Sequence, residues 1–240
     1  RMMSLIFSIK QTGVPLGGAL AGALVPSLVL SLSWRWSAVA VALLCLMVAL
    51  LIQPVRIADA ATSRATRTGS PADFIAPLGM VFANPLLREL AIVSMIFGSA
   101  QLALIAYFVS YLNLELGYGL VAAGLIYSSA HAAGIVGRIA WGAVADRWLS
   151  PRSMLGLLGV MMAVSGMGVA SFSANWPLSA VILVSALFGA SAVGWNGVYL
   201  AEVARLAPPG QVGAITGGTQ FFTFIGALAA PPLFGFVVGL

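Results

Sequence analysis

Long apolar runs separated by short polar segments organise almost the whole chain. A bilayer core about 30 Å thick is crossed by roughly 20 helical residues, each rising about 1.5 Å. Runs of about this length, with no polar face along them, predict an all-α membrane protein, a polytopic bundle of about seven spanning helices. The predicted spans are Met3–Leu32, Trp36–Ile52, Leu90–Leu112, Leu120–Ala143, Met154–Phe172, Leu178–Val203 and Val212–Val238.

The polar connections between these runs differ in length and in charge. Gln53–Arg88 is a long connector, whereas the other links are short. Lys and Arg concentrate on the cytoplasmic loops of membrane proteins, and the alternation of seven spans gives a strongly uneven count here. One side has only Arg35, and the other has Arg1, Arg56, Arg64, Arg67, Arg88, Arg147, Arg152 and Arg205. We therefore expect residues 53–88 and the 145–153 loop to be cytoplasmic.

Composition excludes several classes of protein. Hydrophobic residues make up 61% of the 240 residues and charged residues 7%, against about 25% charged residues in soluble domains. The net charge of +5 is spread between the runs, so it indicates membrane topology and predicts no nucleic-acid partner. Cys45 is the single cysteine, which excludes an intrachain disulfide and a multi-cysteine metal site. No catalytic motif is present, and we expect neither an enzyme nor a cofactor.

Four short motifs occur in an order typical of one family of membrane proteins. The first run contains a Gly/Pro-rich segment, a Trp-rich turn follows it, an Asp-Arg loop follows the fourth run, and an acidic residue precedes a basic, proline-containing loop after the sixth. The motif residues are Gly13-Val14-Pro15-Leu16-Gly17-Gly18, Ser33-Trp34-Arg35-Trp36, Gly142 with Asp146, Arg147 and Arg152, and Glu202 with Arg205 and Pro208. In order, spacing and sidedness they resemble the motifs of the major facilitator superfamily.

This resemblance implies a division of the chain into parts. The seven runs correspond to family helices five to eleven, so residues 1–52 match the last two helices of the N-terminal half. Residues 53–88 match the connector between halves, and residues 89–240 match the first five helices of the C-terminal half. Because the chain starts at Arg1 and stops inside an apolar run, we expect it to be truncated at both ends.

Small residues in the first run predict close helix packing. Glycines at short intervals let two membrane helices approach closely, and such packing takes the place of the hydrophobic driving force that lipid cannot provide. The predicted packing residues are Gly13, Pro15, Gly17, Gly18 and Gly22.

Polar side chains inside the spans are the candidates for substrate binding, because such groups are costly in lipid and usually face a cavity or a partner. Lys10 is the only lysine and suits an anionic solute, or it reaches the headgroups instead. His131 suits a hydrogen bond or a transported proton, or it only packs. The predicted binding set is Lys10, Gln101, His131, Trp195, Asn196 and Gln220.

Charged residues near the cytoplasmic ends of the spans are the candidates for gating. Ion pairs between neighbouring helix ends that form in one state and break in the other would bias the exchange between two conformations. The alternative is a group of charges that only sets membrane topology. The predicted gating residues are Arg138, Asp146, Arg147, Glu202 and Arg205.

The resemblance implies a secondary active transporter that moves a small solute by alternating access. Lys10 favours an organic anion, and we expect proton coupling and a bacterial cytoplasmic membrane. The expected partners are the lipid bilayer, a small solute and protons, with no obligate protein partner. A drug or metabolite exporter of the same superfamily, and a non-transporting membrane receptor or scaffold, are the alternatives.

Overall fold

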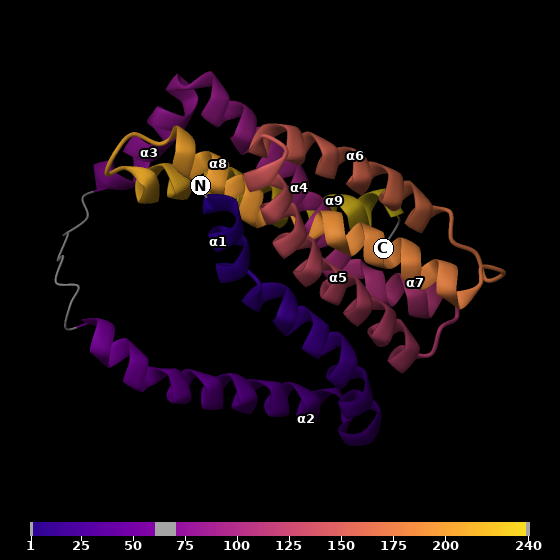
Figure 1. Ribbon diagram of the computed structural model, residues 1–240. Coiled ribbons are helices and arrows are strands. Elements are labelled where there is room, and N and C mark those ends of the chain that lie inside the picture. The colour runs from indigo at the N-terminus through magenta and orange to yellow at the C-terminus, as the bar shows by residue number, and fades with distance from the viewer. Residues whose placement is uncertain (1, 61–70, 239–240) are drawn as a thin grey trace.

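A computed structural model describes residues 2–60 and 71–238, and every element within these ranges is helical (Figure 1). Helices of the bundle lie side by side, with α5 near its middle. The elements are α1 Met3–Lys10, α2 Gly13–Ala60, α3 Pro71–Ala83, α4 Pro85–Ser110, the π-helix η1 Tyr111–Glu115, α5 Leu120–Arg147, α6 Pro151–Ala170, α7 Leu178–Ala192, α8 Asn196–Leu206 and α9 Val212–Val238.

Six helical stretches in the described residues are long and apolar enough to cross a membrane. The first, Met3–Gln53, has 51 residues and would be about 76 Å long if straight, far more than one bilayer core. Ser33 breaks it with φ 71° and ψ 160°, at the turn that the sequence predicts between two spans. All seven predicted runs therefore lie on helices, and the all-helical membrane fold is confirmed.

Two predicted runs are interrupted where the sequence analysis expects continuous helices. The first run has a turn at Gln11 and Thr12, and the sixth has one at Val193–Trp195. At the first break the Thr12 hydroxyl donates to the carbonyl of Ile9 at 2.8 Å, which offers the backbone an alternative to the helical ladder. Pro15 has no N–H to donate to the carbonyl of Gln11, four residues earlier. The break thus leaves an open carbonyl inside the first span.

The connector contains more helix than the sequence analysis predicts. In its described part, α2 continues to Ala60, α3 covers Pro71–Ala83, and α4 begins at Pro85 rather than at Leu90. Asn84 caps α4 by accepting from the backbone N–H of Leu86 at 2.9 Å, and Pro85 suits the first helical position. Val81 of α3 is fully buried and α3 lies against α9. Arg1, Arg64 and Arg67 lie outside the described residues.

Small residues of the first span pack against α5. A Cβ on Gly22 would lie 2.7 Å from the carbonyl oxygen of Gly124, and one on Gly18 would collide with the ring of His131. Pro15 is buried. Gly13 and Gly17, by contrast, have no heavy atom of the described chain within 4 Å of that position. Only one face of the predicted glycine group is therefore used in this contact.

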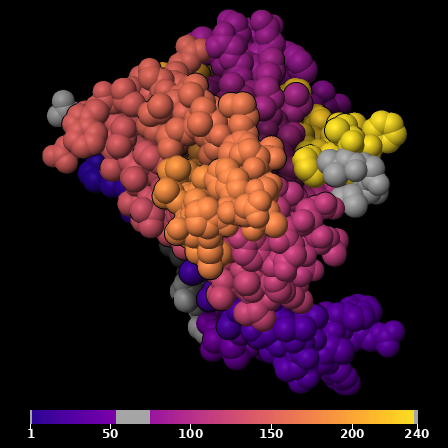
Figure 2. All heavy atoms as spheres, turned by 90° about the vertical axis from the view of Figure 1, so that its right-hand side faces the viewer, coloured from indigo at the N-terminus to yellow at the C-terminus, as the bar shows by residue number. Residues whose placement is uncertain are grey.

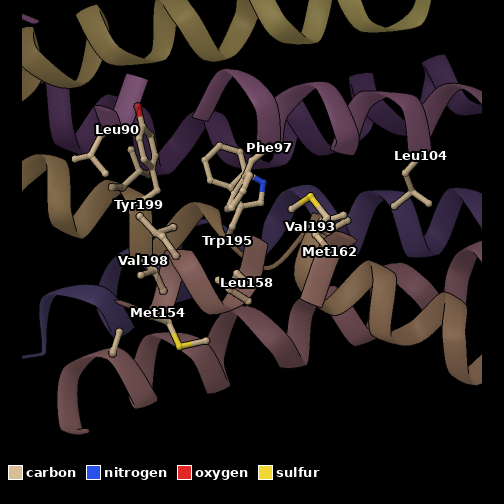
Figure 3. Close-up of a cluster of buried hydrophobic side chains, with 14 of the residues drawn as sticks. Leu90, Phe97, Leu104, Met154, Leu158, Met162, Val193, Trp195, Val198 and Tyr199 are labelled. Atoms are coloured by element: carbon tan, nitrogen blue, oxygen red, sulfur yellow. The ribbon is translucent and has the colours of Figure 1, made fainter. Parts of the chain in front are cut away.

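The buried core lies between α4, α6 and α8, around Trp195 (Figure 3). The part of α2 after Ser33 stands apart from this core, and in Figure 2 the indigo-to-violet helix projects below the rest of the molecule. Its large side chains Leu50 and Leu51 are 62% and 69% exposed. Lipid is the solvent that suits such a surface.

We expect a leucine at Gly22 to disrupt the contact between α2 and α5. Overpacking typically costs about 1–3 kcal/mol, so Gly22→Leu should lower the thermal unfolding temperature of the protein in detergent. Gly17→Leu is the matched control, since that position is open and leucine favours helix over glycine by up to about 1 kcal/mol. Equal destabilisation by both variants would contradict the described contact.

We also expect the two ends of α6 to face opposite compartments. Cysteines introduced at Ser150 and at Ser173, in a background in which Cys45 is replaced by serine, flank the span Pro151–Ala170. A membrane-impermeant maleimide added outside intact cells should label one site, and the other only after permeabilisation. Labelling of both sites from the same side would contradict a spanning α6.

Candidate functional site

Three of the predicted binding residues meet at the break between α7 and α8. Gln101 of α4 accepts hydrogen bonds through Oε1 from Trp195 Nε1 and from Asn196 Nδ2, both at 3.2 Å. Trp195 is fully buried, and the centroid of its ring lies 5.5 Å from that of Phe97 in an edge-to-face contact. Figure 3 shows the two side chains next to each other. The break brings indole and amide side chains to the same point on α4, so we call Gln101, Trp195 and Asn196 the amide group.

The amide group retains polar atoms with which it can bind a solute. Its recorded bonds use Gln101 Oε1 and Asn196 Nδ2, and no hydrogen bond in the described chain uses Gln101 Nε2 or Asn196 Oδ1. Asn196 is partly exposed, whereas Gln101 is only 8% exposed. The free NH2 group of Gln101 and the free amide oxygen of Asn196 suit a hydroxyl, carbonyl or carboxyl group of a small molecule.

Gln220 belongs to a second polar cluster, formed by α4, α8 and α9. Thr223 donates to the hydroxyl of Ser94 at 2.8 Å and also lies 3.0 Å from Gln220 Oε1. The Tyr199 hydroxyl reaches Ser94 and Thr223 but is sealed from solvent without a well-oriented hydrogen bond. Ser94 and Gln101 are seven residues apart on α4, about 10.5 Å along the helix. Gln220 is therefore not part of the amide group.

Sequence reasoning did not single out the threonine and serine members of this cluster. A hydroxyl inside a span can donate to a carbonyl of its own helix, as Ser94 does to Ala91 at 2.9 Å. A serine or threonine in the sequence therefore does not by itself indicate a binding site. Of the predicted binding residues, Trp195 lies on the same face of α8 as Tyr199, four residues later. Trp195, Tyr199 and Glu202 are all fully buried.

Arg138 of α5 is buried and binds backbone carbonyls at both helix breaks. Its Nε donates to the carbonyl of Val193 at 2.8 Å, and its Nη1 donates to the carbonyl of Gln11. The side chain is only 1% exposed. Trp141, three residues later, supports the same region by donating to the carbonyl of Ala190 at 2.8 Å. Arg138 thus supplies the donor that Pro15 cannot give to Gln11.

The structure places Arg138 away from the ends of its helix. It lies nine residues before the end of α5, about 13.5 Å along the helix. Its recorded hydrogen bonds go to carbonyls, and no acidic side chain of the described residues forms an ion pair with it. Arg138 is a group of the bundle interior.

His131 is buried beside the first span, whereas Lys10 of that span is exposed. His131 is 2% exposed, approaches the carbonyl of Tyr127 at 3.3 Å through Nδ1, and packs its ring on Tyr127 and Gly18. Lys10 is exposed at the end of α1 and makes no ion pair in the described chain. Ser8, two positions earlier, is buried against Gly197, so Lys10 faces roughly away from α8.

Asp146 caps the start of α1 from the end of α5. Its Oδ1 accepts from the backbone N–H of Ser4 at 3.2 Å, and its Oδ2 accepts from that of Leu5 at 3.0 Å. The residue at the N-cap position, Met2, has no side-chain oxygen and makes no such bond. A carboxylate is favoured at the positive end of a helix, where N–H groups lack partners. Asp146 thus joins α5 to the first span.

The predicted gating residues form no ion pair between helices with one another in the described chain. Glu202 pairs with Arg205 at 2.6 Å on its own helix, Asp146 binds backbone amides, and Arg147 is exposed. The ion pair that does join two helices is Arg152 with Glu89, between α6 and α4. Spacing alone could not reveal that free N–H groups would compete for Asp146.

Two cavities lie apart from the predicted residues. A cavity of about 580 Å³ opens between α4, η1, α6, α7 and α9, and its mostly apolar lining includes Tyr107, Tyr111, Glu115, Phe188 and Phe234. A smaller one of about 300 Å³ lies between α4 and α6 at the Glu89–Arg152 pair. No group of His, Cys, Asp and Glu in the described ranges could hold a metal ion.

Comparison with known proteins gives one match along almost the whole chain. The family model described as Major Facilitator Superfamily matches residues 2–231. No curated protein and no solved structure matches the chain significantly.

We expect the loss of the Asp146 carboxylate to destabilise the junction of α1 and α5. Removing a helix cap costs about 0.5–2 kcal/mol, so Asp146→Ala should lower the free energy of unfolding by that amount. The free energy of unfolding of Asp146→Asn should lie between those of the wild type and Asp146→Ala, since an amide keeps one acceptor oxygen. Arg147→Ala is the control, because exposed substitutions usually change stability by less than about 0.5 kcal/mol. If unfolding in detergent shows an equal loss of free energy for Arg147→Ala, the capping role of Asp146 would be contradicted.

Proposed function

The chain belongs to the major facilitator superfamily of membrane transporters, and from this premise we propose that it is a secondary active transporter of a small solute. We further propose alternating access, in which helical halves move about a site near the middle of the membrane. Residues 1–52 would be the last two helices of the first half, residues 53–88 the cytoplasmic connector, and residues 89–240 the helices of the second half.

The observation that carries the proposal is the amide group at the α7–α8 break. Polar side chains inside a membrane protein mark solute paths because lipid penalises them elsewhere. Gln101 and Asn196 are hydrogen-bonded to each other, yet the NH2 group of Gln101 and the amide oxygen of Asn196 stay free. Irregular backbone at membrane depth is typical of transporter binding sites. This arrangement supports a solute site that involves α4 and α8.

Asp146 supports the proposed exchange between two states. The carboxylate joins α5 to the amides of Ser4 and Leu5, and the first span also packs on α5 through Gly18 and Gly22. We propose that the bonds of Asp146 hold one state and break in the other, with the 145–153 loop in the cytoplasm. An exchange of this kind needs a contact that differs between the two states.

An organic anion and a proton are the solute and the driving ion that we propose. The cationic side chains Arg138 and Lys10 favour a negatively charged solute. His131 is buried near the first span, and an imidazole is able to exchange a proton near neutral pH. The bacterial cytoplasmic membrane, which maintains a proton gradient, is the location that we propose.

One observation favours a drug or metabolite exporter as the second candidate. The cavity of about 580 Å³ has walls from Tyr107, Tyr111, Phe188 and Phe234, and apolar aromatic walls suit a bulky apolar solute. Such a protein would transport hydrophobic dyes outward and would not depend on the amide group.

Flux measurements in proteoliposomes that contain the complete protein test the proposal. A panel of radiolabelled organic anions, sugars and dyes is tested with and without an inward proton gradient. We expect gradient-dependent anion uptake, and Asn196→Leu and Gln101→Leu should each lower its kcat/KM by about tenfold or more, the equivalent of one lost hydrogen bond of about 1.4 kcal/mol.

Gln211→Leu is the matched control, because Gln211 is an exposed amide in the loop before α9. Reconstituted amounts are compared for all variants to separate folding from transport. Uptake that is unchanged in the Asn196 and Gln101 variants would contradict a role for the amide group. Absence of flux for the whole panel would contradict the transporter proposal itself.

A further inference from the structure

We infer that the contact between Gly18 of the first span and His131 of α5 is the point at which a proton acts on the exchange between two states. The contact holds while the imidazole is neutral and is released when the ring is protonated. The inference rests on the proposed proton-driven transport, for which it names the coupling contact. Three features of the ring support it: its tight fit, its single hydrogen-bond partner, and the absence of a compensating carboxylate among the described side chains.

The first feature is how closely the ring of His131 fits against the backbone of the first span. A Cβ added at Gly18 would overlap the ring atom Cδ2 and lie only 2.5 Å from Nε2. Beside it, the Ser128 hydroxyl donates to the carbonyl of Ala19 at 2.7 Å and holds the two helices in this alignment. His131 is 2% exposed. The ring edge that carries Cδ2 and Nε2 therefore faces the first span.

The second feature is that one nitrogen of the imidazole has a hydrogen-bond partner among the described residues and the other has none. Nδ1 lies 3.3 Å from the carbonyl oxygen of Tyr127. A carbonyl only accepts, so Nδ1 carries the hydrogen of the neutral ring and Nε2 carries none. Protonation makes Nε2 a second donor, for which the described chain supplies no acceptor. A proton can reach this nitrogen, because Nε2 is not among the atoms that are sealed from the surface without a partner.

The third feature is that the titratable groups near the ring do not offset a positive charge on it. On α5 these groups are Tyr127, whose ring centroid lies 4.3 Å away, and Arg138, which is already cationic. Helix α7, which packs on α5 at Ala130, has no titratable side chain. In the first span, Lys10 lies eight positions before Gly18 and is also cationic. An imidazolium in the closed contact is thus a buried, uncompensated charge, which is strongly unfavourable.

The acidic side chains that the structure describes on the other helices around α5 are engaged elsewhere or lie apart from the ring. Asp146, at the end of α5, binds the amides at the start of α1. Glu115 lines the cavity between α4 and α6. The two acidic residues in ion pairs are Glu202 with Arg205 and Glu89 with Arg152.

Protonation of His131 and closure of the contact therefore oppose each other. When the first span moves away from α5, water or a solute can reach Nε2 and accept its hydrogen, so the charged ring is better tolerated. A proton that binds the separated arrangement more tightly than the closed one shifts the population toward separation. The coupling is reciprocal, so separation of the helices also favours uptake of the proton. Lower pH should thus separate the first span from α5.

Distances between spin labels on the first span and on α5 test the inference in the complete protein. Labels at Leu20 and Val136, which are 51% and 67% exposed, leave the contact itself unchanged, and Cys45 is replaced by serine. Double electron–electron resonance in lipid nanodiscs is compared at about pH 8 and about pH 6, the range in which histidine titrates. We expect the population with the longer distance to rise several-fold at the lower pH. Identical distance distributions at both pH values would overturn the inference.

Substitutions then assign the response to the imidazole. His131→Phe keeps an aromatic ring on Tyr127 but cannot be protonated, so its distances should not change with pH. Asp146→Asn removes the other titratable group that joins α5 to the first span, and the pH response should remain. A response that persists in His131→Phe, or that is lost in Asp146→Asn while the closed population is still present, would contradict the inference.

A second pair of variants tests the role of Gly18. Gly18→Leu cannot form the contact with the ring, so the longer distance should dominate already at the higher pH. Gly17→Leu is the matched control, because that position is open, and its distances should follow those of the wild type. Equal behaviour of the two variants would contradict a coupling role for the contact.

Nitrogen NMR of the wild-type ring covers the case in which the variants do not fold. His131 is the only histidine of this chain, and its ¹⁵N signals distinguish the neutral from the charged imidazole. The charged fraction and the separated fraction should follow the same pH curve. A ring that becomes charged without a change in distance, or a distance that changes while the ring stays neutral, would overturn the inference.

The outcomes also separate this inference from the proposed function. Proton-driven flux with distances that do not depend on pH would reject the role of the Gly18–His131 contact and leave the transporter proposal standing. A pH-dependent separation without flux of any solute in the panel would support the contact and reject the transporter proposal.

Discussion

The arrangement of this bundle depends on one constraint: a backbone carbonyl that loses its helical donor inside lipid must find another donor within the protein. The first span and the α7–α8 segment both contain such breaks, and α5 supplies the missing donors. Arg138 binds the carbonyls of Gln11 and Val193, and Trp141 binds that of Ala190. Helix α5 is therefore the element to which both interrupted helices are attached.

The same helix also determines how closely the neighbours approach. The backbone of α5 at Gly124 lies in close contact with the first span at Gly22, and Ala130 lies against Gly189 of α7. Close backbone contact on these two sides is possible because α5 has small residues at both points. The same helix thus provides both the close packing contacts and the hydrogen bonds to its neighbours. Both are needed in a membrane, where lipid supplies neither a hydrophobic driving force between helices nor hydrogen bonds.

The spans were predictable because lipid requires long apolar runs, and the length of a run is visible in the sequence without any tertiary information. The meeting of Gln101, Trp195 and Asn196 was anticipated only as three separate candidates, since the break that turns Asn196 toward α4 depends on packing. Pro15 was the available signal for the first break, because it identifies Gln11 as the carbonyl without a donor. Helix α3 was missed because 13 residues are too short to span and stand in a polar connector.

The cap formed by Asp146 has a consequence for where the bundle is able to come apart. Its two amide partners sit at the very beginning of α1, and water that reaches this helix end can replace the carboxylate there at small energetic cost. The carbonyls held by Arg138 lie deeper, where no such substitute exists unless a wet channel reaches them. Separation of the first span from α5 should therefore begin at the Asp146 cap and proceed toward Arg138 as water enters between the two helices.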